Sequence, residues 1–189
     1  MKRFLLAMMA VALASGHAGA ADEQAALDKA KTMTKELGGA LKQELEKAVK
    51  ESGFAGAVTM CGAIAVEKAE QTGKAHGASI RRVSKKVRNP SNTPDALEEK
   101  ILGTMEADLA AGALKEAYVE KETTSSGKRN LRFLKPIVTA AFCLNCHGEE
   151  SKINPEALKE LNSLYPSDKA RGYGENQLRG AFSSTVALD

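Results

Sequence analysis

Apolar residues recur every three or four positions over the first half of the chain, a pattern typical of amphipathic helices. Between residues 22 and 52 the apolar face comprises Leu27, Ala30, Met33, Leu37, Leu41, Leu45 and Val49. The pair Gly38-Gly39 lowers helix propensity within this stretch and is a candidate for a bend or a break. After Ser52-Gly53 a second helical pattern runs to about Thr72, and Cys61 lies on its apolar face.

Residues 79–85 alternate as a strand does, with Ile80, Arg82 and Ser84 on one side and the intervening residues on the other. The turn-rich stretch that follows, residues 89–95, predicts Thr93 as the N-cap and Pro94 as the first residue of a third helix, which ends near Gly112.

The remaining pattern predicts three more strands and one short helix. Two strands, residues 114–123 and 130–139, flank a hairpin turn at 125–128, and a helix over 155–164 precedes a last strand over 180–188. Helices and strands do not alternate as β-α-β units. The pattern therefore predicts one α+β domain over residues 21–189, with a small antiparallel sheet and helices to one side of it.

The first 20 residues predict a signal peptide that is cleaved after Ala20. Lys2 and Arg3 precede an apolar run, which ends before the small residues at 18–20. The run is shorter than the roughly 20 residues that a membrane-spanning helix needs, so no stable membrane insertion is expected. The mature protein is predicted to be exported to the periplasm.

Composition narrows the class of protein. The 189 residues are 43% hydrophobic and 27% charged, as in ordinary globular proteins. Removing the basic signal peptide lowers the formal net charge from +3 to about +1, which gives no case for binding nucleic acid. Three cysteines remain, Cys61, Cys143 and Cys146, and simple disulfide pairing would leave one thiol over.

Residues 143–147 read Cys-Leu-Asn-Cys-His, the attachment motif for c-type haem. Cys143 and Cys146, one helical turn apart, are predicted to form thioethers with the two haem vinyl groups. His147 then supplies the proximal nitrogen to the iron. One such motif predicts one covalent haem.

Three other readings of this motif remain open. A thioredoxin-like pair would need a β-α-β context, and a structural disulfide between Cys143 and Cys146 suits an oxidising compartment. Structural zinc usually takes four Cys or His ligands, and Cys61 or His76 could complete such a set with Cys143, Cys146 and His147.

The second axial ligand of the iron is not determined by composition alone. Cys61, Met105, His76 and the absence of a ligand are equally good hypotheses. Met60 points about 100° away from its neighbour Cys61 on the helix, and Met33 is a further thioether. A free cysteine is also an ordinary core residue.

Several stretches occur together in an order that resembles a known family. They are Cys61 on an early helix, then residues 80–84, 88–95, 143–148, 165–173 and 179–181. This ordered set looks like the PAS-like c-type haem domain family, long catalogued as a domain of unknown function, and it covers essentially the whole mature chain. The resemblance implies a PAS-like antiparallel sheet with flanking helices and one haem held between His147 and a cysteine, here Cys61.

Arg81, Arg82 and Arg88 lie in these stretches and are candidates for pairing with the haem propionates, because a guanidinium binds a carboxylate with two parallel hydrogen bonds. The sequence thus predicts a monohaem cytochrome, with a redox or signalling protein as its unidentified partner, that acts in electron transfer or redox response. The alternative is a haem-based sensor of redox state or of a diatomic gas. No catalysis is expected, because only His76 offers an imidazole for acid–base work beside the haem.

Overall fold

The computed structural model describes the backbone of residues 12–188 and the side chains of residues 19–188 other than residue 63. Residues 1–11 of the predicted signal peptide lie outside this described part, so the division into a cleaved segment 1–20 and a mature domain 21–189 stays a prediction. Within the described residues, no helix is long and apolar enough to cross a membrane.

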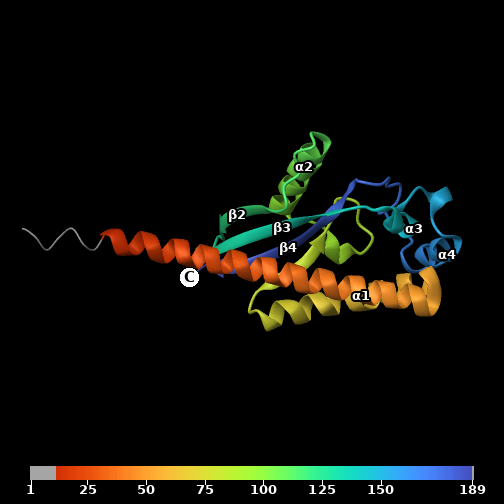
Figure 1. Ribbon diagram of the computed structural model, residues 1–189, viewed down its shortest axis with the longest axis horizontal. Coiled ribbons are helices and arrows are strands. Elements are labelled where there is room, and N and C mark those ends of the chain that lie inside the picture. Colours follow the sequence, from red (N-terminus) through yellow and green to blue (C-terminus); the bar gives the residue numbers. More distant parts are fainter. Residues whose placement is uncertain (1–11, 189) are drawn as a thin grey trace, which may run out of the picture.

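Helix α1, Ala12–Ala75, consists of two arms that fold back on each other (Figure 1). The arms meet at Gly53, whose φ of 66° and ψ of −171° are not helical and suit a residue without a Cβ atom. The predicted break after Ser52 is therefore confirmed. The helix does not break at Gly38-Gly39. A Cβ on Gly38 would lie 3.5 Å from the ring of Phe182, so this glycine allows close packing of helix and sheet.

The sheet contains four antiparallel strands in the order β1-β4-β3-β2. They are β1 Ser79–Val83, β2 Tyr118–Thr123, β3 Arg129–Val138 and β4 Leu178–Leu188. Strands β2 and β3 form the predicted hairpin. In β4 the register shifts, so that Ile137 pairs with Gly180 and Val138 with Leu178. Arg179 is thereby the extra residue of a bulge, a feature that redirects a side chain.

Helices cover both faces of this sheet. On one face Met33 and Leu37 of α1 pack against Ile80 of β1. On the other face α2, Ala96–Ala110, packs Met105 against Val83 (Figure 1). The α+β class with flanking helices is confirmed, but the expectation of helices to one side only is wrong. Successive strand residues point to opposite faces of the sheet, so β1 carries an apolar side chain on each face, and both side chains are buried by a helix.

Helix α2 begins later than the sequence pattern predicts. Asp95, and not Thr93, is the N-cap: its carboxylate accepts a hydrogen bond from the Glu98 amide at 2.8 Å, and the Glu98 carboxylate accepts one from the Asp95 amide at 2.8 Å. This reciprocal capping box satisfies two helix-end amides. Thr93 instead closes the short 3₁₀ turn η1, Pro90–Asn92, and Pro94 lies outside the helix.

Short helices gather at one end of the sheet, beside the turn of α1 (Figure 1). In chain order they are η2 Ala141–Cys143, α3 Leu144–His147, η3 Glu150–Lys152 and α4 Pro155–Leu164. The predicted helix over 155–164 is confirmed, with the Asn154 side chain as its cap. Ala157 and Leu161 of α4 pack against Val58 of α1 and hold this end together.

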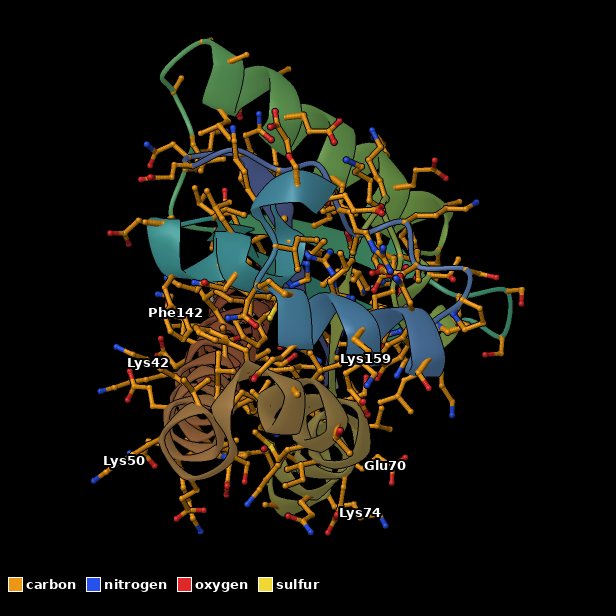
Figure 2. All side chains as sticks on the ribbon, turned by 90° about the vertical axis from the view of Figure 1, so that its right-hand side faces the viewer. Lys42, Lys50, Glu70, Lys74, Phe142 and Lys159 are labelled. Carbon is orange, nitrogen blue, oxygen red and sulfur yellow. The ribbon has the colours of Figure 1, made fainter. Side chains whose placement is uncertain are left out.

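Figure 2 looks directly at this end of the molecule. Lys42, Lys50, Glu70 and Lys74 point outward from the two arms of α1, and all four are exposed. Phe142 lies above the arms, 45% exposed, with its ring centroid 5.8 Å from that of Phe54. Charged groups therefore cover the outside of the α1 hairpin, whereas an aromatic pair lies between it and η2.

Candidate functional site

A large cavity lies between the second arm of α1, the ends of β1, β3 and β4, and the segment that contains η2 and α3. Its empty space is about 1200 Å³, counting the part that opens to solvent. Its apolar walls come from Leu45, Phe54, Ala57, Val58, Val83, Ile137, Val138 and Phe142.

The predicted Cys-x-x-Cys-His motif forms a compact turn on one wall of this cavity. Cys143 ends η2, where its amide donates to Ala140 O at 2.9 Å, and the single turn of α3 follows. Cys143, Cys146 and His147 all line the cavity. The spacing of the motif residues thus places two thiols and an imidazole on one wall of the cavity.

His147 is fixed in one tautomer. Its Nδ1 lies 2.8 Å from the carbonyl oxygen of Ala170, which only accepts, so Nδ1 carries the proton and Nε2 keeps its lone pair. Burial lowers the pKa of His147 well below its usual value, and the neighbouring Arg179 and Arg88 add to this effect. The edge of the ring faces Tyr173, with centroids 6.2 Å apart. The side chain is a neutral imidazole ready to bind a metal through Nε2.

Cys61 lines the same cavity from the second arm of α1. It is half-buried, and burial raises the pKa of its thiol, while Arg82 and Arg88 act in the opposite direction. All three cysteines are free, so the alternative of a Cys143–Cys146 disulfide does not match the structure. The fold brings together the three cysteines and the histidine that the sequence singled out.

The other candidate ligands lie elsewhere. His76 pairs with Glu36 at 2.7 Å near the end of α1, and Met33 and Met105 are fully buried in the two sheet-facing cores. Met60 does not line the cavity. Among the described residues, no cluster of three or more His, Cys, Asp or Glu side chains is arranged to hold a metal ion.

Arg82 points into the cavity without a carboxylate partner. Among the described residues it makes no hydrogen bond or ion pair. Burial lowers the pKa of its guanidinium, although the neighbouring Cys61 and Tyr165 act against this. A buried cation normally has a paired anion, so the cavity wall around Arg82 is suited to a bound carboxylate.

Arg179, which the sequence reasoning missed, is a second guanidinium of this kind. It donates to Ser84 Oγ at 2.7 Å and lies 5.6 Å from the ring centroid of Tyr173, but its buried Nε has no partner and no described carboxylate pairs with it. Burial lowers the pKa of Arg179 as well. The bulge in β4 turns this side chain toward the cavity. Its sequence signal was its place in the stretch 179–181, which is part of the family resemblance.

The other two predicted arginines have different roles. Arg88 lines the cavity, but its Nε donates to Asp168 at 3.1 Å and its Nη2 to the carbonyl of Cys146, so it braces the motif. Arg81 lies outside the cavity, where its guanidinium pairs with Glu98 and donates to the Thr93 carbonyl. The prediction that Arg81 pairs with a propionate is wrong, because alternate residues of β1 face opposite sides of the sheet.

The residues present fit a c-type haem. One cavity is lined by two thiols one turn apart, by a neutral imidazole with a free Nε2 and by a thiol from another element. Two guanidiniums without carboxylate partners line it as well. The fold and this donor set define the class: an α+β, PAS-like domain built around a Cys-x-x-Cys-His turn.

A family model described as Tll0287-like matches residues 19–187, and the chain belongs to this family. Among solved structures, the chain is similar to the crystal structure of the cyanobacterial heme-protein Tll0287. The TM-score is 0.60 at 21% identity, with 86% of this chain and 92% of that chain covered. This likeness supports the fold. No curated protein matches the chain.

Proposed function

We propose that this protein is an exported monohaem c-type cytochrome that works in electron transfer or redox response. The observation that carries the proposal is the meeting of Cys143, Cys146, His147 and Cys61 around one cavity. The family match and the likeness to a structure titled as a heme-protein support it. Export to the periplasm, with cleavage after Ala20, is part of the proposal and supplies the oxidising compartment in which c-type attachment takes place.

In this proposal each side chain has a separate task. Cys143 and Cys146 hold the haem covalently, and His147 binds the iron through Nε2 because its Nδ1 is engaged with a backbone carbonyl. Cys61 binds the opposite axial position. The bound haem supplies reversible one-electron exchange between ferric and ferrous iron. Arg82 and Arg179 are the chain's donors for the two propionates.

The proposed ligand pair determines the direction of the reduction potential. A thiolate donates charge to the iron and stabilises the ferric state, whereas a methionine ligand raises the potential. We therefore expect a lower potential than that of a His/Met cytochrome. A potential in the high His/Met range would contradict axial binding by Cys61.

A second candidate, a sensor of redox state or of a diatomic gas, follows from an asymmetry between the two ligands. His147 is anchored by a 2.8 Å hydrogen bond, whereas the Cys61 thiol makes no hydrogen bond with any described residue. Cys61 is thus the ligand free to leave on reduction. Ready CO binding by the ferrous protein would favour the sensor, and persistent six-coordinate ferrous iron would favour electron transfer.

We further propose that the protein is not an enzyme. Peroxidase chemistry would need an acid–base group beside an open iron position. His76, the only such imidazole that the sequence offered, pairs with Glu36 outside the cavity. A turnover assay with peroxide and an electron donor checks this, and sustained turnover would overturn it.

The proposal is tested by expressing the full chain in a bacterial periplasm that contains the c-type maturation system. Mass spectrometry and the pyridine haemochrome spectrum report covalent haem, and the ferric absorption and EPR spectra report the axial ligands. Cys61→Ala should change the ferric Soret and charge-transfer bands while the haem stays attached. Met60→Ala is the matched control, since Met60 adjoins Cys61 but does not line the cavity. A wild-type chain without covalent haem would refute the proposal.

A further inference from the structure

The carboxylate of Asp168 holds the loop that follows α4 against the Cys-x-x-Cys-His turn. The side chain of Asp168 is completely buried. Its Oδ1 accepts a hydrogen bond from the amide of Ala170 at 2.8 Å, and its Oδ2 accepts from Arg88 Nε at 3.1 Å and from Arg171 Nε at 3.0 Å. A buried carboxylate with three donors in a fixed arrangement is a rigid anchor for the backbone around it.

This anchor reaches the proposed iron ligand by two short routes. Through the backbone, Asp168 holds the amide of Ala170, whose own carbonyl accepts from His147 Nδ1 at 2.8 Å. Through a side chain, it holds Arg88, which also donates to the carbonyl of Cys146, the residue before the histidine. One carboxylate thus restrains the partner of the imidazole and the backbone from which the imidazole extends.

The loop and the turn are also joined by backbone hydrogen bonds. The amide of Tyr173 donates to His147 O at 2.9 Å, and the amide of Gly172 donates to Gly148 O at 2.8 Å. These bonds position the loop after Ala170. At Ala170 itself, the amide donates to Asp168, and the carbonyl that receives His147 Nδ1 also accepts a hydrogen bond from Arg88 Nη2 at 3.4 Å.

We propose that Asp168 is a positioning residue for the axial histidine: by aiming the Ala170 carbonyl at Nδ1 it fixes the rotation and tautomer of His147 and strengthens the imidazole–iron bond. This inference rests on the proposed function. A hydrogen bond from the second ring nitrogen to a carbonyl raises the basicity of the ligating nitrogen. Loss of such partners typically lowers metal affinity about 10- to 100-fold.

The test compares haem-loaded proteins during acid titration. In the ferric wild type, the absorption spectrum reports the pH at which His147 is protonated and leaves the iron, while the thioethers keep the haem in place. Asp168→Asn should weaken the bond about tenfold, which raises this midpoint by about one pH unit. Asp108→Asn is the matched control. It removes one carboxylate that accepts a 2.6 Å hydrogen bond from Tyr118, away from the cavity.

Asp168→Glu separates position from charge, because it keeps the anion but displaces it by one methylene in a fully buried site. We expect the midpoint to rise in this variant as well. Complete restoration to the wild-type midpoint would show that charge alone matters and would overturn the positioning role. An unchanged midpoint in haem-loaded Asp168→Asn would overturn it too.

If Asp168→Asn does not accumulate as folded protein, Arg88→Lys replaces it. Lysine keeps the charge but cannot reach Asp168 and the Cys146 carbonyl with separate nitrogens. The same upward shift is expected, and a wild-type midpoint would count against the inference. Failure of the proposed function is recognised separately, because the wild type itself would then lack covalent haem, and both proposals would fall.

Discussion

Gly180 offers a sharp test of how the strands shape the cavity. It lies in β4 with φ of 154°, directly after Arg179 at the bulge, and it lines the cavity. A Cβ atom there would stand 2.2 Å from the carbonyl oxygen of Val83 and 3.1 Å from Ser84 Cβ. The nearest atom belongs to the backbone of the neighbouring strand, so no side-chain rotation relieves the clash.

The expected cost of Gly180→Ala follows from two contributions. Overpacking in a well-packed region costs about 1–3 kcal/mol, and a backbone conformation that L-residues rarely adopt costs about 1–3 kcal/mol more. A total of roughly 2–6 kcal/mol lowers the melting temperature by at least about 4 °C, since each kcal/mol corresponds to about 2–4 °C in a domain of this size.

Gly39→Ala is the matched control, for which the melting temperature should change in the opposite direction. Gly39 is exposed inside α1, and a Cβ there would meet nothing within 4 Å. Replacing glycine by alanine in a helix interior gains about 0.5–1 kcal/mol, so this melting temperature should rise by about 1–4 °C. Thermal unfolding followed by circular dichroism measures both variants. Equal melting temperatures for the two would refute the reasoning from backbone contact.

Three further predictions follow from single side chains. Arg82→Gln removes a proposed hydrogen-bond donor to a propionate, worth about 1.5–3 kcal/mol, so the pKa of that propionate should rise by about one to two units. The inflection in the pH dependence of the reduction potential should then move to higher pH. Arg81→Gln, outside the cavity, is the control and should leave the inflection unchanged. Partial burial raises the pKa of Asp95, but hydrogen bonds from the Glu98 amide and the Arg132 guanidinium hold this pKa below 3.8. Because the ionised form is the stabilised one, Asp95→Asn should cost about 0.5–1 kcal/mol in urea unfolding at pH 7, and this difference should vanish as the pH falls below the lowered pKa. Leu161→Ala, at a fully buried position, should cost about 2–5 kcal/mol, and Leu164→Ala on the same helix, 45% exposed, should cost far less in the same assay.

Local sequence signals predicted the residues on one wall of the cavity. Cys143, Cys146 and His147 lie within five residues, so their spacing alone determines that they share a turn. Cys61 was placed on the apolar face of its helix by periodicity, but periodicity does not say what that face covers. The break at Gly53, which folds the second arm of α1 over the cavity, decides this.

Features that depend on distant partners were not predicted from the sequence. Arg88 looked free in sequence, yet its carboxylate partner Asp168 follows 80 residues later. Arg179 was missed because a bulge, which has no reliable sequence signal, turns it toward the cavity. The start of α2 was readable, since Asp95 and Glu98 have the spacing of a capping box, whereas Thr93 has no acidic residue three positions on.

The buried arginines on the two faces of the sheet differ in whether a carboxylate lies beside them, and this contrast supports the proposed role of Arg82 and Arg179. On the α2 face, Arg132 lies within 3.1 Å of the buried Glu98 carboxylate, which Arg81 also contacts. On the α1 face, Arg82 follows Arg81 directly in β1 but lacks any described carboxylate, as does Arg179 in the adjacent strand. The neighbouring residue in the same strand, Arg81, thus has a buried carboxylate partner that Arg82 lacks. Guanidiniums that are largely removed from water and lack anions are costly in isolation, and the carboxylates of a bound ligand, such as the propionates of the proposed haem, would offset that cost.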